Sequence, residues 1–215
     1  MTKKERYQFI LAYFEQNNPE AETELLYKTE YELIVAVILS AQCTDKRVNL
    51  ITPAFFKKFN DFKTLSSATV ADVYELIKSC SYPNNKAKNL VNMAQHVVNL
   101  CNKKLPETVA ELEQLPGVGR KTANVLASVL FNKPVIAVDT HVFRVAARIG
   151  LTTNAKTPLE TEKQLEKHIP EHLRAIAHHW LILHGRYVCK ARKPACEKCQ
   201  IKMACKYYKS IDRNV

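Results

Sequence analysis

The sequence lacks any apolar run long enough to cross a bilayer, because its longest stretch, Leu33–Leu39, is far shorter than a membrane span. The amino-terminal residues, MTKKERYQFI, also lack the extended apolar core of a signal peptide. We therefore expect a cytoplasmic protein that does not bind a membrane. Thiols stay reduced in that compartment, so the seven cysteines are expected to be metal ligands or core residues rather than disulfides.

Alternation of apolar and polar residues, the pattern of a half-buried strand, is also rare, whereas helical spacing recurs from end to end. No low-complexity linker and no repeat of fixed period is present. The sequence thus predicts an all-α fold, in which the strand-like run VIAV at 135–138 is a buried connection. The expected helices span 5–16, 30–41, 45–59, 70–79, 86–101, 108–114, 120–131, 140–149, 159–169 and 171–184.

Local signals mark several helix ends. Thr29 and Thr108 each precede a glutamate by three residues, which is the pattern of a capping box. Gly150 and Gly185 follow apolar helical runs and are expected to end them in a left-handed conformation. Pro53 falls inside the third expected helix and predicts a break or a later start there.

Acidic residues are in deficit, since 21 Asp and Glu stand against 32 Lys and Arg and give a net charge of +11. Such an excess is typical of proteins with a polyanionic partner, most often nucleic acid and less often an acidic membrane surface. The alternative is a soluble protein that is merely basic. The charge therefore favours nucleic acid without establishing it.

Glycine is scarce, with four in the chain, yet two of them fall within LPGVGRKTA at 115–123. The flanking helices and this loop predict a helix-hairpin-helix. Gly117 and Gly119, with Val118 between them, would let the backbone approach a ligand, and the next helix begins directly after them. Its positive end would then face a phosphate, with Arg120 beside it. The alternative is a tight turn between helices that binds nothing.

Lys121 falls at the edge of the stripe that Val125, Leu126 and Val129 define on the second hairpin helix, whereas Arg120 points away from it. An ordinary lysine with a pKa of about 10.4 is only ~0.04% neutral at pH 7. Partial burial, the helix end and Arg120 would all lower the pKa of Lys121, as a nucleophile requires. The simpler role is a surface lysine that contacts a phosphate.

Asp139 lies between the apolar connection and an amphipathic helix, in PVIAVDTHVFRVAARIG. Its simplest role is the N-cap of that helix. A capping carboxylate is ionised and held in place, so the same residue also suits an electrostatic or base role beside a forming cation. For Asp45, in SAQCTDKRVN, we expect a helix start or a supporting role.

Cys189, Cys196, Cys199 and Cys205 lie close together near the carboxyl terminus, with the spacing C-x6-C-x2-C-x5-C. Four such thiols in a cytosolic chain predict a metal site. Structural zinc favours paired knuckles, and only the middle pair qualifies, whereas iron–sulfur clusters accept more varied spacings. Both remain open on spacing alone. The other cysteines, Cys43, Cys80 and Cys101, lie in apolar helical contexts and are expected in the core.

The loop between the first two of these cysteines is basic. It reads KARKPA and contains Lys190, Arg192 and Lys193. A metal site would fold this short segment and present the basic side chains to phosphates. The alternative is a solvated run of charge.

The hairpin, the lysine, the aspartate and the cysteines together make the chain resemble the endonuclease III family of DNA repair glycosylases. The matching segments, which cover nearly the whole chain, are LSAQCTD, LPGVGRKTANV, AVDTHVFRV, HHWLILHGRYVC and the cysteine tail. The resemblance implies two helical domains with DNA in the cleft between them. One spans 22–132 and carries the helix-hairpin-helix at 108–131. The other combines 1–21 with 133–215 and holds a [4Fe-4S] cluster on the four cysteines.

The resemblance also implies a chemistry. A damaged pyrimidine is flipped out of the duplex, Lys121 attacks the sugar C1′, and the base leaves as a Schiff base forms. The imine acidifies the C2′ proton, so β-elimination cuts the strand on the 3′ side. Asp139 would help to deprotonate Lys121, while Gln42 and His141 would lie near the flipped nucleotide or the gap it leaves. The partner is double-stranded DNA with a damaged pyrimidine or an abasic site, bound by a monomer associated with the nucleoid.

One segment departs from the family pattern. Members usually carry a glycine and an apolar wedge, as in Gly-Leu-Tyr-Asn, before the Lys-Ala of the next helix, whereas this chain has Ser81, Tyr82, Pro83 and Asn84. Tyr82 takes the apparent wedge position and could stack between bases. Lesion preference and the choice of opposite base are therefore open.

Three other functions compete with this interpretation. A related adenine glycosylase would lack Lys121 and carry a further carboxyl-terminal domain, whereas this chain stops ten residues after Cys205. A non-catalytic iron–sulfur DNA-binding module would leave the pairing of Lys121 with Asp139 unexplained. A zinc-bound regulator fits the cysteine spacing less well. We therefore expect a bifunctional glycosylase and abasic-site lyase.

Overall fold

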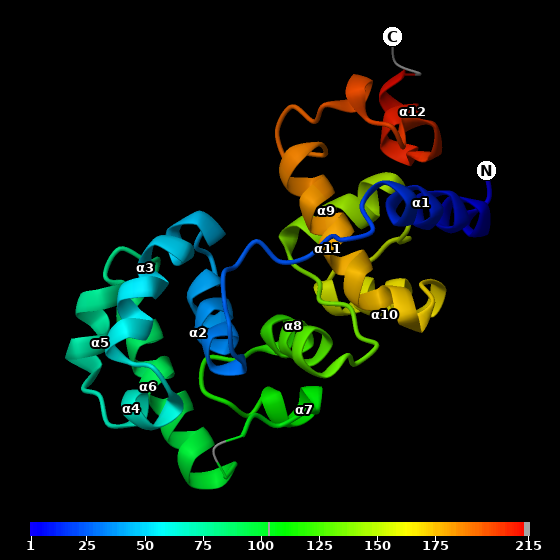
Figure 1. Ribbon diagram of the computed structural model, residues 1–215. Coiled ribbons are helices and arrows are strands. Elements are labelled where there is room, and N and C mark those ends of the chain that lie inside the picture. The colour runs from blue at the N-terminus through cyan, green and yellow to red at the C-terminus, as the bar shows by residue number, and fades with distance from the viewer. Residues whose placement is uncertain (103, 213–215) are drawn as a thin grey trace. The chain divides into compact units, whose positions relative to one another are not determined.

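The computed structural model describes residues 1–102 and 104–212, and every regular element within them is helical. The predicted all-α fold is confirmed, and residues 135–138 are a connection without regular secondary structure, buried from Ile136 to Val138. The chain divides into two compact units, residues 23–131 and residues 1–22 together with 132–215 (Figure 1). None of the described helices combines the length and the apolar character that a membrane crossing requires.

The unit of residues 23–131 is built around one helix. Its elements are α2 (Glu30–Ser40), α3 (Asp45–Lys58), α4 (Phe62–Ser66), α5 (Val70–Ile77), α6 (Pro83–Leu100), α7 (Val109–Leu112) and α8 (Arg120–Phe131). All residues from Leu33 to Leu39 of α2 are buried, because a helix that is apolar on every side must be covered all round. Helices α3, α6 and α8 pack against α2, and α4 and α5 cover α6.

Pro53 does not break α3, contrary to the prediction from sequence. The helix continues to Lys58, with Ile51 and Phe55 buried on either side of the proline. An interior proline costs about 3 kcal/mol, through a lost hydrogen bond and a clash with the preceding turn. Burial of each large apolar side chain contributes about 1.5–3 kcal/mol. Packing of the two neighbours therefore outweighs the local preference.

Thr29 and Thr108 are N-caps, as predicted. Each hydroxyl accepts a hydrogen bond of 3.2 Å from the backbone N–H three residues later, at Glu32 and Glu111 respectively. The glutamates do not complete the capping box. Glu32 accepts instead from the backbone N–H of Lys28 at 2.6 Å, and Glu111 from the hydroxyl of Thr108 at 2.6 Å. Both carboxylates still lie in the first turn, where the helix dipole favours negative charge.

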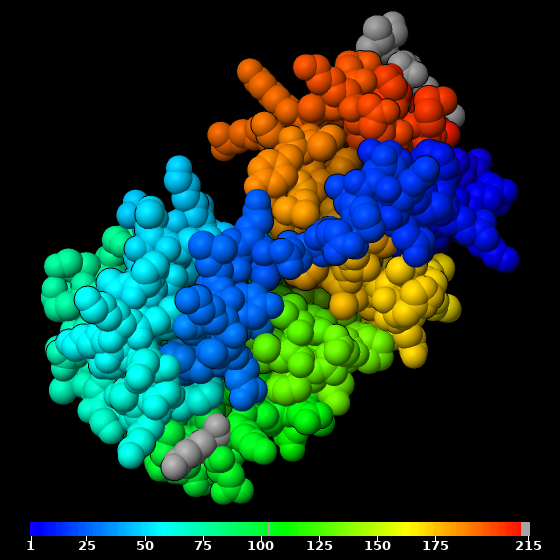
Figure 2. Space-filling view, viewed as in Figure 1, coloured from blue at the N-terminus to red at the C-terminus, as the bar shows by residue number. Residues whose placement is uncertain are grey.

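The second unit joins the two ends of the chain. Its elements are α1 (Lys3–Asn17), α9 (Thr140–Ile149), α10 (Pro158–His168), α11 (Glu171–Tyr187), the 3-10 turns η1 (Cys196–Lys198) and η2 (Lys202–Ala204), and α12 (Lys206–Asp212). In Figures 1 and 2 the blue helix α1 lies against the red carboxyl-terminal segment. The buried Arg6 connects them, since its Nε donates to the carbonyl of Ala204 at 2.8 Å. Trp180 of α11 likewise donates to the carbonyl of Asn18 at 2.7 Å.

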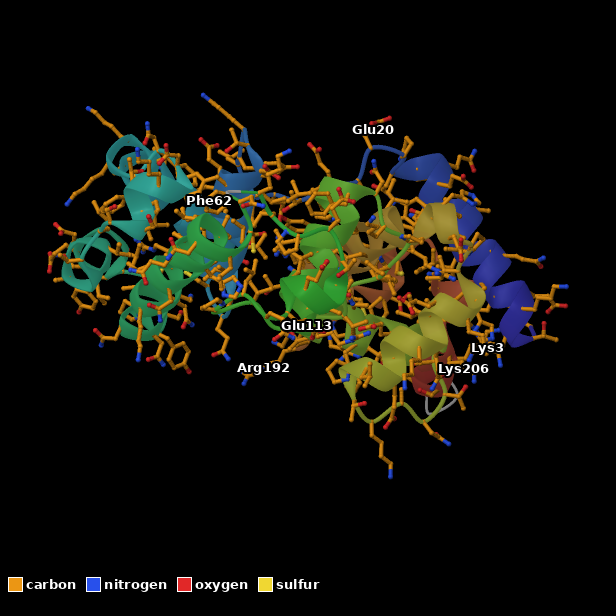
Figure 3. All side chains as sticks on the ribbon, turned by 90° about the horizontal axis from the view of Figure 1, so that it is seen from below. Lys3, Glu20, Phe62, Glu113, Arg192 and Lys206 are labelled. Carbon is orange, nitrogen blue, oxygen red and sulfur yellow. The ribbon has the colours of Figure 1, made fainter. Side chains whose placement is uncertain are left out.

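Two lysines from the ends of the chain also lie close together. Figure 3 shows Lys3 and Lys206 side by side. Desolvation first, and then the positive charges of Lys206 and Lys167, lower the pKa of Lys3. The hydrogen bonds and apolar contacts of α1 therefore hold it in place against local charge repulsion.

The two glycines predicted as helix caps differ in outcome. Gly150 ends α9 with φ 89°, and its N–H donates to the carbonyl of Ala146, as expected of a left-handed cap. Gly185 instead lies inside α11, which runs on to Tyr187, so that prediction was wrong. A Cβ at Gly185 would lie 2.9 Å from the Cβ of His141. This glycine is needed because α9 and α11 approach closely, which no local signal reveals.

One buried tyrosine in each unit is expected to make the folded protein less stable as the pH rises above about 10. Burial raises the pKa of Tyr7, and burial followed by the charges of Asp61 and Glu32 raises that of Tyr31, well above the usual 10. Above about pH 10 the unfolded chain releases protons that the folded chain keeps, so the free energy of unfolding falls as pH rises. Each tyrosine contributes a slope of about 1.4 kcal/mol per pH unit at most.

Urea denaturation at several values between about pH 9 and pH 11 should show this loss. Tyr31→Phe removes one of the two groups and the hydrogen bond that its hydroxyl donates to the carbonyl of Phe59 at 2.8 Å. The variant is expected to be less stable at neutral pH and to lose stability less steeply above about pH 10. An unchanged alkaline slope would contradict the assignment.

Candidate functional site

The glycine loop between α7 and α8 has two glycines with different roles. Gly117 has φ 82°, and a Cβ there would lie 2.8 Å from the Cβ of Asn89 on α6. Val118 is buried and donates its N–H to the carbonyl of Leu115 at 3.0 Å, which fixes the loop to the core. Gly119 is exposed, and a Cβ there would meet no atom within 4 Å. Gly117 is thus required by the fold, whereas Gly119 leaves the backbone open to a ligand.

The first turn of α8 follows this loop and carries both basic residues singled out from the sequence. Arg120 is exposed, and its Nη1 lies 3.5 Å from Oε2 of Glu113 in the same hairpin. Lys121 is partly buried, and residues 122–128 after it are buried. The predicted orientation is therefore confirmed, with Arg120 turned to solvent and Lys121 at the edge of the apolar face. Lys121 thus belongs to the first turn of α8, at the amino-terminal end of that helix.

Two exposed residues with unusual backbone lie on neighbouring loops of this unit. Gln42 follows α2 with φ 53°, and Tyr82 precedes α6 with φ 54°. The hydroxyl of Ser81 donates to the carbonyl of Gln42 at 2.6 Å, which ties one loop to the other. Left-handed backbone is costly for residues other than glycine, by about 1–2 kcal/mol each, and persists where the surroundings impose it.

Lys86 holds these two loops together, and sequence reasoning missed it. Its ammonium is buried and donates to the carbonyls of Leu39 and Ala41, both at 2.7 Å, at the end of α2. Burial lowers the pKa of Lys86. The signal was present, because Lys86 falls on the stripe of α6 that Leu90 and Met93 continue at helical spacing. A lysine on an apolar stripe points to a buried partner.

Asp139 lies in the other unit, at the junction that the sequence suggested. It is the N-cap of α9, and its Oδ1 accepts from the N–H of Val142 at 2.8 Å, as predicted. The connection before it is fixed by His178 of α11, whose buried ring donates to the carbonyl of Ala137 at 2.7 Å. His141 follows in the first turn of α9, partly buried, with Nδ1 3.2 Å from Nη2 of Arg144. The carboxylate of Asp139 is therefore oriented by the fold.

The four cysteines of the tail line one cavity. The cavity and its opening to solvent together contain about 340 Å³ of space free of protein atoms. Cys189, Cys196, Cys199 and Cys205 border this space among apolar side chains such as Ile149 and Ile201. Among the residues with a described structure, no three His, Cys, Asp or Glu side chains form a site for a single metal ion.

The chemistry of this cavity fits a group that carries several metal ions. Desolvation, and then the charge of the neighbouring thiols, raises the pKa of Cys196, and desolvation is also the first cause for Cys199 and Cys205. Burial makes the thiolate forms unfavourable, and a cationic iron–sulfur core would offset that cost by binding the thiolates. The size of such a core would also place its four ligands around a cavity.

Two arginines of α9, also missed from the sequence, hold the segment that begins at Cys189. Arg144 Nη2 donates to the carbonyl of Cys189 at 3.2 Å and to that of Gly185 at 3.0 Å. Arg148 donates to the carbonyls of Lys190 at 2.7 Å and Ala191 at 3.0 Å. Their spacing of four residues on one helix face was the available signal.

The basic side chains of that segment point into solvent. Lys190, Arg192 and Lys193 are all exposed, and Figure 3 shows Arg192 extending away from the ribbon. Lys193 has φ 50°, so the loop turns sharply at that residue. Arg148 donates hydrogen bonds to backbone carbonyls of the loop, which leaves the exposed basic side chains of the loop available to an external anion.

Known proteins resemble this chain over nearly its full length. The family model of the HhH-GPD superfamily of base excision DNA repair proteins matches residues 35–171. Endonuclease III of Rickettsia felis is 47% identical over 201 residues, which are 94% of each chain. Endonuclease III of Escherichia coli is 42% identical over 212 residues, 99% of this chain and 100% of its own. A trapped covalent intermediate of endonuclease III with DNA superposes with a TM-score of 0.93 at 39% identity, covering 99% and 100% of the two chains.

Proposed function

Because the chain belongs to the HhH-GPD superfamily of base excision DNA repair proteins and is a DNA glycosylase with abasic-site lyase activity, we propose that it removes oxidised pyrimidines from duplex DNA and cuts the strand by β-elimination. The observation that carries the proposal is the position of Lys121. It is a partly buried amine in the first turn of α8, directly after a glycine loop whose outer face is open.

Lys121 acts as the nucleophile of the proposed reaction. Its neutral amine forms a bond to C1′ of the sugar as the bond from C1′ to the damaged base breaks, and the base leaves with a proton. The sugar ring opens to an imine, which makes the C2′ proton acidic. Loss of that proton expels the 3′ phosphate and cuts the strand, and water then hydrolyses the imine, which frees the amine of Lys121 and leaves an unsaturated aldehyde. Asp139, a carboxylate held by the N-terminus of α9, accepts the lysine proton and stabilises the cationic sugar.

We assign the proposed DNA contacts by the chemistry of each side chain. Gln42, Tyr82 and His141 contact the flipped nucleotide or the gap that it leaves, with Tyr82 stacking between bases. The backbone of Gly117, Val118 and Gly119 meets a phosphate beside Arg120. Phosphates also pair with Lys190, Arg192 and Lys193 of the exposed loop. The protein works as a monomer in the cytoplasm, on nucleoid DNA.

Cys189, Cys196, Cys199 and Cys205 are the proposed ligands of a [4Fe-4S] cluster, since all four border one cavity. When bound, the cluster would join these four positions of the carboxyl-terminal segment and so keep the segment folded; it would not supply electrons for bond cleavage. Around it, Arg144 and Arg148 keep the basic loop in one conformation.

Strand cleavage tests the proposal directly. The purified protein is incubated with three matched duplexes, which contain one oxidised pyrimidine, one abasic site or no damage. We expect cleavage of the first two, leaving an unsaturated aldehyde at the 3′ end, and none of the third. Release of base without cleavage would contradict the lyase step. Cleavage of abasic DNA alone would contradict the proposed base substrate.

The two glycines of the loop give a matched pair of variants. Gly117→Ala places a Cβ 2.8 Å from Asn89 on left-handed backbone and is expected to destabilise the fold by about 1–3 kcal/mol. Gly119→Ala meets nothing in the fold, so its melting temperature should match that of the wild type. Its methyl group obstructs the proposed phosphate contact, and affinity for abasic duplex should fall about tenfold, or about 1.4 kcal/mol. Thermal melting and fluorescence anisotropy measure both. Unchanged affinity of Gly119→Ala would contradict phosphate binding at this loop.

A further inference from the structure

Cys43 and Cys80, two cysteines outside the tail, have their Sγ atoms 3.8 Å apart. Cys43 follows α2 and is partly exposed, whereas Cys80 precedes α6 and is buried. The sequence predicted both as core residues, 37 positions apart, and gave no sign that they meet. Neither borders the cavity of the tail cysteines, which belongs to the other unit.

The surroundings already hold the two sulfur atoms together. Ser81 bonds the carbonyl of Gln42 at 2.6 Å, and Lys86 bonds the end of α2 at 2.7 Å. Cys43 and Cys80 are the chain neighbours of Gln42 and Ser81. The fold therefore already holds the two thiols close together, so their reaction loses little further conformational entropy.

We propose that Cys43 and Cys80 form a redox-sensitive thiol pair that a hydroperoxide converts into a disulfide. Cys43 reacts first because it is the more exposed. Cys43 first loses its thiol proton; its sulfur then takes one oxygen from the peroxide, whose O–O bond breaks, and becomes a sulfenic acid, while the departing hydroxide takes up the released proton as water. Cys80 sulfur then attacks the sulfenic sulfur and a second water leaves. Two thiols and one hydrogen peroxide thus give one disulfide and two waters.

The electrostatics agree with this order. Burial first, and then the neighbouring Cys43, raise the pKa of Cys80 to about 11, while Lys86 and Arg47 partly oppose the rise. Cys80 is therefore mainly a protonated thiol at neutral pH in the reduced protein. The two cations then stabilise the thiolate form that attacks.

Oxidation would alter the loops that carry Gln42 and Tyr82, and this consequence rests on the proposed function. A disulfide bond is about 2.05 Å long, so the two sulfur atoms must approach by roughly 1.7 Å. The flanking residues Gln42 and Ser81 move with them, and Tyr82 with Ser81. We expect the oxidised protein to bind abasic duplex several-fold more weakly than the reduced protein.

Peptide mapping of the cluster-containing protein tests the chemistry. Hydrogen peroxide is added while absorbance near 400 nm confirms that any iron–sulfur group is retained, and the protein is digested with trypsin without reduction. We expect residues 29–46 and 79–86 to be recovered as one cross-linked species that dithiothreitol separates. Cys43→Ser and Cys80→Ala should abolish it, and Cys101→Ser, a partly buried cysteine of the same unit, should not. Oxidation of Cys43 to a sulfinic acid with no cross-link, or an equal cross-link to Cys101, would overturn the proposal.

Binding to a duplex with a tetrahydrofuran abasic analogue tests the consequence. Weaker binding after oxidation, restored by dithiothreitol and absent in Cys80→Ala, supports the effect on the loops. Equal binding before and after a mapped cross-link overturns it. Failure of the reduced wild type to bind would contradict the proposed function instead, whereas the peptide map stands independently of DNA.

Discussion

Lys121→Gln is expected to abolish covalent trapping on abasic DNA and to slow strand cleavage at least about 1,000-fold. Borohydride reduces the imine between the amine and C1′, so the wild type should give a stable protein–DNA species of higher mass. Glutamine has similar length but no nucleophilic amine. Because Lys121 is only partly buried and lies at the edge of the apolar face of α8, the substitution should leave the fold intact. Denaturing electrophoresis after borohydride treatment measures the effect.

Arg120→Gln is the matched control, since it removes a positive charge one residue away on the exposed side. It should weaken binding modestly and retain trapping. If Lys121→Gln still forms the covalent species, another amine is the nucleophile. If the wild type binds abasic DNA and forms none, Lys121 is a phosphate contact and the enzyme does not use a Schiff base.

Cys199→Ser is expected to remove visible absorption near 400 nm and to unfold the segment of the tail cysteines. Metal binding that folds a segment contributes on the order of 10 kcal/mol, more than the hydrogen bonds from Arg6, Arg144 and Arg148 to this segment can replace at about 1 kcal/mol each. The two 3-10 turns η1 and η2 flank Cys199 and are only three residues long each, so they supply few hydrogen bonds of their own. Protease cleavage near Lys190 should therefore become fast, while the unit of residues 23–131 stays resistant.

Cys101→Ser again serves as the control, because it removes a cysteine from the other unit and should leave the absorption band unchanged. Analysis of bound iron, sulfide and zinc distinguishes an iron–sulfur cluster from a zinc site, the two alternatives that the cysteine spacing left open. A purified wild type that contains zinc and no iron would overturn the cluster, and the absorption band would be absent from all three proteins.

The sequence by itself determined whatever depends on residues that are near one another in the chain. Helical spacing predicted the all-α fold, and short polar side chains before apolar runs predicted the N-caps at Thr29, Thr108 and Asp139. Gly117 and Gly119 predicted the hairpin, and the edge position of Lys121 followed from 100° per residue. These features rest on backbone hydrogen bonds and side-chain angles within one or two turns, so local sequence suffices.

Tertiary structure decided the features in which distant segments compete with a local preference. Packing around Phe55 carried α3 through Pro53, and the close approach of α9 placed Gly185 inside α11. The short helices α4 and α12 were not predicted, because five and seven residues give no clear period and their stability comes from the surfaces they cover. Most local preferences are worth about 1 kcal/mol and an interior proline about 3 kcal/mol, whereas burial of each large apolar side chain contributes about 1.5–3 kcal/mol and several such side chains act together.

The same reasoning explains which site residues were missed. Lys86 and Arg148 act on backbone carbonyls of other helices and loops, and Cys43 meets Cys80 across 37 residues. Lys121, the proposed nucleophile, stands out by its type and its neighbours, but groups that position others are recognised only by what they contact. The sequence therefore determined which chemistry the chain carries, and the tertiary structure decided how that chemistry is held, because long-range contacts are set by the packing of whole helices.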